Sequence, residues 1–205
     1  MSLKLRLASI YTPGFLLKKE LDRLSERTLK AMDDLLDEQA VGGRGGRPGD
    51  VVMTGSLEER RTAMTKAQNE RASALVAALG REEAVRLGRR QLHAVGVAIG
   101  EEMKKRMAVG ESLEDLQRAA RVMYKVLGID FEMESKGGRT TMIVHRCALS
   151  RHYSAEACEI LSATDEGVVE GLNPRLSMRF EERIAAGSEA CKARIEGVRP
   201  GEVRP

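Results

Sequence analysis

The sequence predicts an α+β fold: N-terminal helices, followed by a β-hairpin, a helix and a second β-hairpin whose strands form one antiparallel four-stranded sheet. Two observations support this fold class. Over most of residues 1–128, apolar residues recur at three- and four-residue steps, as in amphipathic helices. After Gly128, apolar and charged residues alternate, as in half-buried strands. We expect a helical arm with a Gly-rich linker (1–55), a helical region (56–128), an α+β region with the cysteines (129–197) and a loose tail (198–205).

The first 128 residues predict four helices, with a flexible loop after the first one. Residues 1–14 contain Pro13-Gly14 and are expected to be irregular. Ser56 and Glu59 have the spacing of a capping box, in which each side chain satisfies a backbone amide of the other residue at a helix start. The stretch 42–49 holds five glycines and a proline, which cannot continue a helix, and it lacks the Gly-Lys-Ser/Thr ending of a phosphate-binding loop. The helices are expected over 15–40, 56–79, 82–109 and 112–128.

The last third of the chain predicts two hairpins on either side of a helix. The helix is expected over 149–170, with an interruption near 162–164. Asn173-Pro174 ends it, and Gly187-Ser188 turns the chain between the last two strands. This helix or the earlier helices would cover one face of the sheet. The strands are expected over 129–134, 140–147, 176–180 and 191–196.

Composition and charge exclude several classes of function. The chain has 34 Lys and Arg against 31 Asp and Glu, so its net charge of +3 is spread over helices of mixed sign. A nucleic-acid-binding protein needs a one-sided basic stripe, and three Tyr, three Phe and no Trp are too few aromatics for a base-stacking platform. No apolar run approaches the roughly 20 residues that cross a bilayer, and no secretory signal follows Met1. We therefore expect a cytoplasmic protein with neither a nucleic-acid nor a membrane partner.

All three cysteines, Cys147, Cys158 and Cys191, lie in the last third of the chain, and their odd number argues against a disulfide framework. His145 lies two residues before Cys147 on a predicted strand, so the two side chains are expected on the same face. A neighbouring imidazolium or helix start lowers the pKa of a thiol, which makes Cys147 the best candidate nucleophile. Asp165 follows Cys158 by seven residues, about two helical turns, and could orient a base or activate water.

Other interpretations of these residues stay open. Free cysteine often packs as a small hydrophobe, which suits Cys191 on the apolar face of the last strand and applies also to Cys147 and Cys158. Three thiolates and one imidazole, here with His145, also form a known ligand set for zinc or an iron–sulfur cluster, although the spacing contains no close CxxC pair. Two coupled thiols, Cys147 and Cys158, would be typical of a redox sensor. Outside the metal alternative, no cofactor is expected.

Short motifs of the C-terminal part resemble the L-2-amino-thiazoline-4-carboxylic acid hydrolase-like family over residues 112–197. They are His145-Arg146-Cys147, Ala157-Cys158, Asp165, Asn173-Pro174-Arg175-Leu176 and the stretch 187–195. That last stretch, Gly-Ser-Glu followed by an alternating strand, is also similar to the last strand of 4-vinyl reductase domains, which are small ligand-binding α+β domains. The resemblance to the hydrolase family implies hydrolysis at the C=N centre of a cyclic thiazoline, which opens the ring to a carbamoyl-cysteine.

The resulting hypothesis is a small hydrolase that acts on a cyclic C–N bond. Cys147 attacks the electrophilic carbon between nitrogen and sulfur, or Asp165 activates a water that does so, and His145 donates the proton to the leaving atom. The assigned residues are Cys147, His145, Asp165 and Cys158 in catalysis, with Cys191 and Asn173 in substrate binding.

A second class of function is a sensor module of 4-vinyl reductase type. Such a module would bind a small molecule, a metal or an iron–sulfur cluster without catalysis. In either case the partner is a small-molecule ligand or substrate. The long apolar stripes over 15–110 also predict a homo-oligomer that forms through the N-terminal helices, because these stripes exceed what one small sheet can cover.

Overall fold

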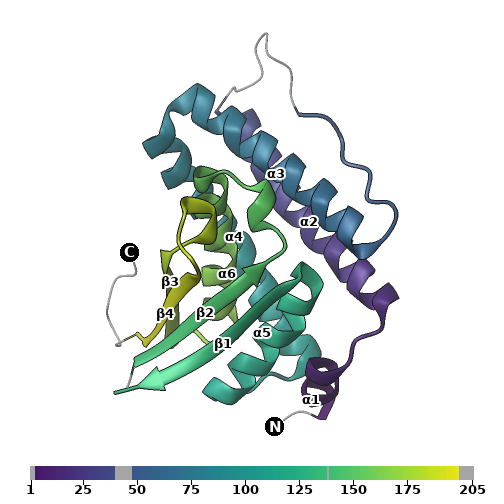
Figure 1. Cartoon of the computed structure of the whole chain (residues 1–205), viewed down its shortest axis with the longest axis vertical. Coiled ribbons are helices and arrows are strands. Elements are labelled where there is room, and N and C mark those ends of the chain that lie inside the picture. The colour runs from purple at the N-terminus through teal and green to yellow at the C-terminus, as the bar shows by residue number, and fades with distance from the viewer. Residues whose placement is uncertain (1–2, 40–47, 138, 199–205) are drawn as a thin grey trace.

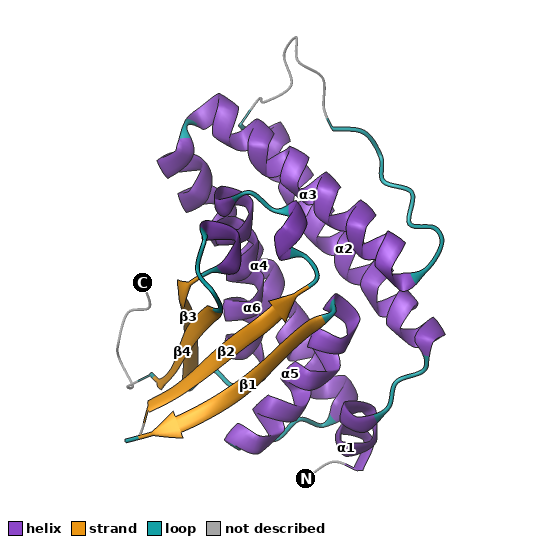
Figure 2. Ribbon diagram, in the orientation of Figure 1, coloured by secondary structure: helices purple, strands orange, loops and turns teal. Residues whose placement is uncertain are grey.

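The computed structural model of the chain describes residues 3–39, 48–137 and 139–198. Within them, helices come first, followed by a hairpin, a helix and a second hairpin (Figures 1 and 2), so the α+β fold class is confirmed. The expected flexible loop and loose tail lie largely outside the described residues. The elements are α1 (Leu3–Ile10), α2 (Gly14–Glu38), α3 (Leu57–Leu79), α4 (Arg81–Met107), α5 (Leu113–Leu127), β1 (Ile129–Lys136), β2 (Arg139–Cys147), η1 (Ser150–His152), α6 (Ala155–Leu172), β3 (Leu176–Glu182), η2 (Ile184–Ala186) and β4 (Cys191–Gly197).

The sheet has the strand order β1-β2-β4-β3, and every neighbouring pair is antiparallel. Met142 pairs with Ala193, and Met178 pairs with Ile195. These four side chains are buried on one face of the sheet, where α5 and α6 pack, while α4 lies against α6 (Figure 2). The main core therefore lies between the sheet and α6, because the alternation of apolar and polar residues leaves the other face of each strand to solvent.

The helix starts predicted at residues 56 and 112 are confirmed by individual hydrogen bonds, whereas α6 begins at Ala155, six residues after the expected residue 149. The Ser56 hydroxyl accepts from the amide of Glu59 at 3.2 Å, and the Glu59 carboxylate accepts from the amide of Ser56 at 2.7 Å. Ser112 and Ser154 cap α5 and α6 in the same way through their hydroxyls. Each such cap satisfies amides that have no partner within the helix and contributes about 1 kcal/mol.

Two predictions about helices were wrong. The residues before Pro13 form α1, although only one of its side chains, Leu5, is buried. Its last turn is held by Lys125 of α5, whose ammonium donates to the carbonyl of Ile10 at 2.7 Å, a tertiary contact that the local sequence does not reveal. Helix α6 also runs without the interruption expected near 162–164, because the Ser162 hydroxyl donates to the carbonyl of Glu159 at 3.0 Å and stays compatible with the helix.

Helices α4 and α6 touch backbone to backbone through glycines. A Cβ atom on Gly96 would lie 2.1 Å from the carbonyl oxygen of Thr164, and one on Gly167 would lie 2.1 Å from that of His93. No side chain larger than hydrogen fits at either position without moving a helix. This close approach fixes the position of α6, and of the side chains that it carries, against α4.

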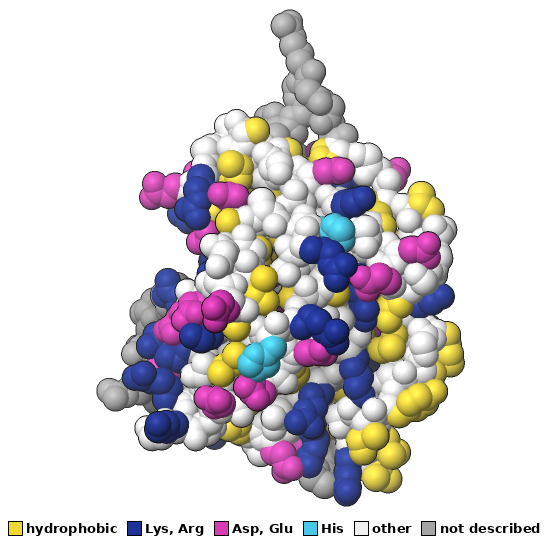
Figure 3. Space-filling model, viewed as in Figure 1, with side chains coloured by type: hydrophobic (Ala, Val, Ile, Leu, Met, Phe, Trp, Pro, Cys, Tyr) yellow, Lys and Arg dark blue, Asp and Glu magenta, His cyan; other side chains and the backbone are white. Residues whose placement is uncertain are grey.

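The apolar stripes of the long helices are buried inside the chain. Leu21 and Met32 of α2, Leu75 of α3 and Leu92 of α4 are almost fully buried. Association of copies through these helices stays a prediction. The large apolar side chains that remain exposed lie mainly on α1 and the start of α2, where Figure 3 shows hydrophobic groups beside Lys and Arg. Among the described residues, no helix is both long and apolar enough to cross a membrane.

Candidate active site

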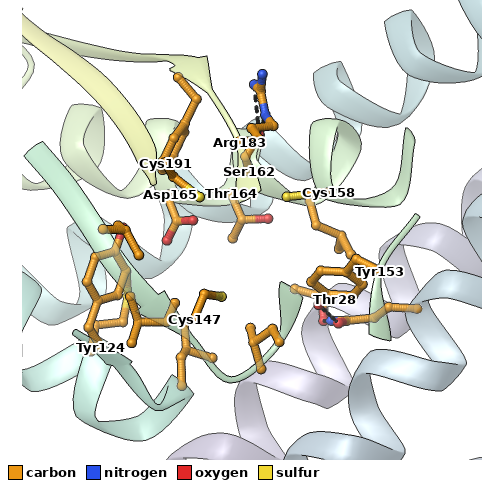
Figure 4. A pocket seen from close by; sticks show the side chains of 18 of the residues that line it. Thr28, Tyr124, Cys147, Tyr153, Cys158, Ser162, Thr164, Asp165, Arg183 and Cys191 are labelled. Atoms are coloured by element: carbon orange, nitrogen blue, oxygen red, sulfur yellow. Dashed lines mark hydrogen bonds between the residues drawn. The ribbon is translucent and has the colours of Figure 1, made fainter. Parts of the chain in front are cut away.

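A cavity of about 90 Å³ lies between the covered face of the sheet and the helices α2, α3, α5 and α6. Nine of its twenty lining side chains are Leu, Ile, Val, Met or Phe, and the other eleven carry a polar or thiol group and come from distant parts of the chain (Figure 4). That mixture is typical of a small-molecule site, in which the apolar lining supplies affinity and the polar groups fix orientation. The polar and thiol side chains are Thr28, Gln68, Tyr124, Cys147, Tyr153, Cys158, Ser162, Thr164, Asp165, Arg183 and Cys191.

The structure brings together four of the residues assigned from the sequence. Cys147 at the end of β2, Cys158 and Asp165 on α6, and Cys191 at the start of β4 all line this cavity (Figure 4). Cys158 and Asp165 share one face of α6, as their seven-residue spacing predicted. Cys191 is buried, and its sulfur accepts a hydrogen bond from the amide of Ile184 at 3.3 Å.

His145 does not share a face with Cys147, so that expectation was wrong. In the pairing of β1 with β2, Asp130 faces Arg146 and Phe131 faces Val144, which leaves His145 as an extra residue in a β-bulge. The bulge shifts the alternation by one residue and turns Cys147 to the covered face. The His145 imidazole is exposed on the other face and makes a hydrogen bond with the Glu132 carboxylate at 2.8 Å.

Asn173 also lies outside the cavity. It ends α6, where its side-chain amide donates to the carbonyl of Glu111 at 3.1 Å and its side-chain oxygen accepts from the amide of Arg175 at 3.0 Å. These contacts close the turn from α6 into β3. The structure therefore gives Asn173 a role in this turn rather than in the lining of the cavity.

The set proposed for metal binding is not assembled, because His145 lies on the opposite face of the sheet from the three cysteines. Among the described residues, no group of three or more His, Cys, Asp or Glu side chains is arranged to hold a metal ion. The residues present therefore do not fit the zinc or iron–sulfur alternative.

Asp165 is the carboxyl group most altered by the cavity. Burial, helped by the negative charge of the neighbouring Glu166, raises its pKa from 3.8 to about 7, and a hydrogen bond with Tyr124 opposes the shift. Glu166 itself accepts a hydrogen bond from Arg89 at 2.7 Å and another from the amide of Phe180 at 3.2 Å. Two adjacent carboxyls thus have different environments: Glu166 is paired, while Asp165 faces the cavity and can take up or release a proton near neutral pH.

Burial raises the pKa of all three thiols above the ordinary value of 9.0. For Cys158 it rises to about 12. For Cys147 and Cys191, backbone hydrogen bonds oppose the effect of burial without cancelling it. At neutral pH these thiols are protonated, and protonated thiols are poor nucleophiles.

Several polar residues of the cavity were missed in the sequence because nothing in their local pattern marks them. Burial raises the pKa of Tyr124 and of Tyr153 well above 10, so both hydroxyls stay protonated. The Tyr153 hydroxyl donates to the side chain of Gln68, which in turn donates to the hydroxyl of Thr28 at 2.7 Å. This chain of bonds ties the loop after β2 to α3 and α2 and closes one end of the cavity.

Thr164 differs from these residues because its hydroxyl is buried and has no hydrogen-bond partner among the residues that the structure describes. It lies next to Asp165 in the chain, and both side chains face the cavity (Figure 4). A buried hydroxyl without a partner costs about 1–3 kcal/mol, so a bound water or ligand at this position would relieve a real penalty.

A second cavity of about 270 Å³ lies between α1, α2, α4 and α5. Leu24 and Met123 line both cavities and form the wall between them. None of the residues assigned from the sequence lines this outer cavity.

The comparison with protein families finds a match over most of the chain. The model of a family described as L-2-amino-thiazoline-4-carboxylic acid hydrolase matches residues 60–195. The chain belongs to this family. The matched region of the hydrolase family includes every lining residue of the smaller cavity except Leu24 and Thr28 of α2.

Comparison with curated proteins finds no match. Among solved structures, the phenol-responsive sensory domain of the transcription activator PoxR with phenol is similar at 17% identity over 71% of this chain and 76% of that chain, with a TM-score of 0.49. The trafficking protein particle complex subunit 3 from Naegleria fowleri, covalently bound to palmitic acid, is similar at 16% identity over 66% of this chain and 97% of that chain, with a TM-score of 0.47.

Proposed function

We propose that the smaller cavity is the active site of a hydrolase that opens small cyclic amidines of the 2-aminothiazoline type. One observation carries this proposal: Asp165 faces a largely apolar cavity and has a pKa of about 7. A carboxyl group tuned to this range exchanges protons at neutral pH and is the typical equipment of a general acid–base catalyst. Membership of the hydrolase family supports the reaction type.

In the proposed reaction, the ionised Asp165 takes a proton from a water molecule while the water oxygen attacks the ring carbon between nitrogen and sulfur. A carbon–oxygen bond forms, and the C=N bond becomes a C–N single bond as the ring nitrogen gains a proton. The carbon–sulfur bond then breaks, because a thiolate leaves more easily than an amide anion. The proton that the ring nitrogen gains is the one that Asp165 took from the water. Asp165 then takes the remaining proton of the water oxygen, which becomes the carbonyl oxygen of a carbamoyl group, and passes it to the sulfur.

The residues around Asp165 suit this sequence of steps. The partnerless hydroxyl of Thr164 can hold the attacking water beside the carboxylate. Tyr124, protonated and hydrogen-bonded to Asp165, can fix the direction of the carboxylate. The three protonated thiols and the apolar side chains exclude bulk water, which strengthens electrostatic interactions inside the cavity.

Attack by Cys147 is the second route that the geometry allows. The Cys147 side chain faces the same space as Asp165 (Figure 4), so the carboxylate could remove the thiol proton. We rank this route below water attack, because burial raises the pKa of Cys147 and so opposes thiolate formation.

The test is ring opening of 2-aminothiazoline-4-carboxylate, followed by proton NMR, in the intact protein and three variants. Asp165→Asn is expected to lower kcat by about 10²–10⁴-fold, the usual contribution of a general base. Cys147→Ser is expected to retain a rate within about threefold, since it removes neither the base nor the water. Asp130→Asn, which alters an exposed carboxylate on β1, is the matched control and should leave the rate unchanged.

Each alternative has its own outcome in this experiment. A large loss in Cys147→Ser would replace the water route with a covalent one. Binding of the ring compound without turnover in the intact protein would overturn the hydrolase proposal in favour of a ligand-binding module.

A further inference from the structure

Arg183 is the only cationic side chain in the lining of the smaller cavity among the described residues. It follows β3 directly and lies half-buried at the edge of the cavity next to Ser162 (Figure 4). Its Nε and Nη2 atoms both donate to the hydroxyl of Ser162, at 3.2 and 3.1 Å, and its guanidinium lies 5.7 Å from the centre of the Phe180 ring. Within the described part of the chain it forms no ion pair with a carboxylate.

A second β-bulge places this side chain. In the pairing of β3 with β4, Phe180 faces Ala193 and Glu182 faces Lys192, so Glu181 is the extra residue. As at His145, the bulge shifts the alternation by one residue, and Arg183 is turned to the covered face instead of to solvent. Bulges often re-aim side chains beside functional sites, and here both of them deliver a residue to the same cavity.

Among the described residues, no carboxylate balances the positive charge of the Arg183 guanidinium. Two of its five N–H donors share one neutral hydroxyl oxygen, and the Ser162 hydroxyl is held in place because it donates to the carbonyl of Glu159. Arg89, which packs on the same helix, is by contrast neutralised by Glu166. A half-buried, oriented guanidinium with free donors and no counter-charge matches a planar anion such as a carboxylate, which it can bind through two parallel bonds.

We infer that Arg183 forms a carboxylate subsite of the cavity, so that the protein selects small cyclic acids over their uncharged analogues. This inference rests on the proposed function for the identity of the reacting ring and names the residue that orients it. Cys158, Cys191, Thr164 and Asp165 line the same cavity as Arg183 (Figure 4), so a ring whose carboxylate is bound at Arg183 is expected to lie beside them. A cavity of about 90 Å³ restricts the ligand to a small ring. Arg183 is then a positioning residue that sets specificity.

The first experiment measures binding, independently of turnover. Thiazole-4-carboxylate, a planar acid that cannot be ring-opened by this route, and its carboxamide are titrated into the intact protein by calorimetry. The acid is expected to bind roughly 10–100-fold more tightly than the amide, as a charge-assisted bidentate pair implies. Equal affinity for acid and amide in the intact protein overturns the subsite, and this comparison requires no variant to fold.

The second experiment assigns the preference to Arg183. Arg183→Gln is expected to remove the preference for the acid while it leaves the affinity for the amide unchanged, and Arg183→Lys is expected to keep part of it. Arg179→Gln, an exposed arginine on the same strand, is the control and should keep the full preference. A preference for the acid that persists in Arg183→Gln overturns the assignment.

Kinetics separate this inference from the proposed function. With the 2-aminothiazoline acid, Arg183→Gln is expected to raise KM by about 10–100-fold with a smaller change in kcat. Acid-selective binding that depends on Arg183 but without turnover would support the subsite and overturn the hydrolase. Turnover with no difference between acid and amide, or no effect of Arg183→Gln, would support the hydrolase and overturn the subsite.

Discussion

The smaller cavity, here called the inner cavity, and the outer cavity lie on either side of Leu24 and Met123 and differ in how their charges are balanced. In the outer cavity, Arg23 and Arg27 contact Glu102 at 2.5 and 2.6 Å. Arg106 pairs with Glu20 in the same cavity at 2.7 Å. The inner cavity holds one carboxyl, Asp165, and one guanidinium, Arg183, and within the described residues neither is in an ion pair.

This difference, more than cavity size, supports the proposed site in the inner cavity. The outer cavity is the larger one, yet its charged groups satisfy one another and stabilise the packing of α2 on α4. The inner cavity contains a carboxyl with a raised pKa, a guanidinium without a counter-charge and a hydroxyl without a partner. Such groups reduce stability unless a ligand completes them, so their concentration in one small cavity indicates binding and catalysis.

Removal of a carboxyl group should stabilise the protein at Asp165 of the inner cavity and destabilise it at Glu102 of the outer cavity. The effect at Asp165 should be the larger of the two. The pKa of Asp165 is about 7 in the folded protein, against an ordinary value of 3.8 that applies to the unfolded chain. Between about pH 4 and pH 7 the unfolded chain has therefore released this proton while the folded protein still holds it. The free energy of unfolding consequently falls as pH rises through this range. Asp165→Asn escapes this cost and should be more stable than the intact protein by on the order of 2–4 kcal/mol at pH 8, with little difference at pH 4. Urea unfolding followed by circular dichroism at pH 4, 6 and 8 measures this, and a difference independent of pH would contradict it.

The pH dependence of catalysis sharpens the same contrast. With ionised Asp165 as base, kcat/KM should rise about tenfold per pH unit below 7 and level off above it, which amounts to roughly a hundredfold between pH 5 and 8. A thiolate nucleophile would behave differently, because the pKa of each cavity thiol is raised above 9.0. A rate that continues to rise beyond pH 8 would therefore assign the reaction to a thiol instead of to Asp165.

In the outer cavity, Glu102→Gln should destabilise the protein without affecting the reaction. Although burial opposes ionisation, Arg27 and Arg23 lower the pKa of Glu102, so its contribution to stability is present above its ordinary pKa of 4.5 and is lost as pH falls below it. At pH 7 the variant should lose about 1 kcal/mol, since the pairs are only partly buried. Denaturant midpoints at pH 7 and pH 3 check the sign, and a changed kcat/KM would mean that the outer cavity takes part in the reaction.

The smallest effect is expected from His145→Ala, on the face of the sheet opposite to both cavities. Its pair with Glu132 is exposed, so the free energy of unfolding should change by less than about 0.5 kcal/mol. The value of kcat/KM should stay within about twofold of that of the intact protein. Steady-state kinetics on this variant test the expectation, and a loss of kcat/KM of tenfold or more would mean that His145 takes part in catalysis.

The sequence predicted the elements well because local signals determine them. The capping spacing of Ser56 and Glu59, and the change from helical to alternating period after Gly128, are properties of neighbouring residues. Element order left open whether Cys147 and Cys158 come together, and the folded structure places both in the lining of one cavity. Helix α1 escaped prediction because its last turn depends on a distant lysine, and such contacts leave no local trace.

The candidate site was predicted only in part because two bulges break the rule on which the prediction rested. Strict alternation places His145 on the same face as Cys147, and one extra residue in β2 separates them. Arg183 carries no local signal in the sequence, and one extra residue in β3 turns it to the covered face. The raised pKa of Asp165 depends on burial beside Glu166, which requires the assembled fold. The identities of the thiols and the carboxyl were available from the sequence, whereas the direction of each side chain was not.

The glycine contact between α4 and α6 has a consequence for how this cavity can change in evolution. Because main chain rests on main chain at Gly96 and Gly167, the side of the cavity that carries Thr164 and Asp165 has no room to retreat. The lining also includes Met64 of α3 and Met123 of α5, whose unbranched side chains adopt new rotamers at little cost. Relatives that accept bulkier rings should therefore differ first at these methionine positions, while α6 keeps its position against α4.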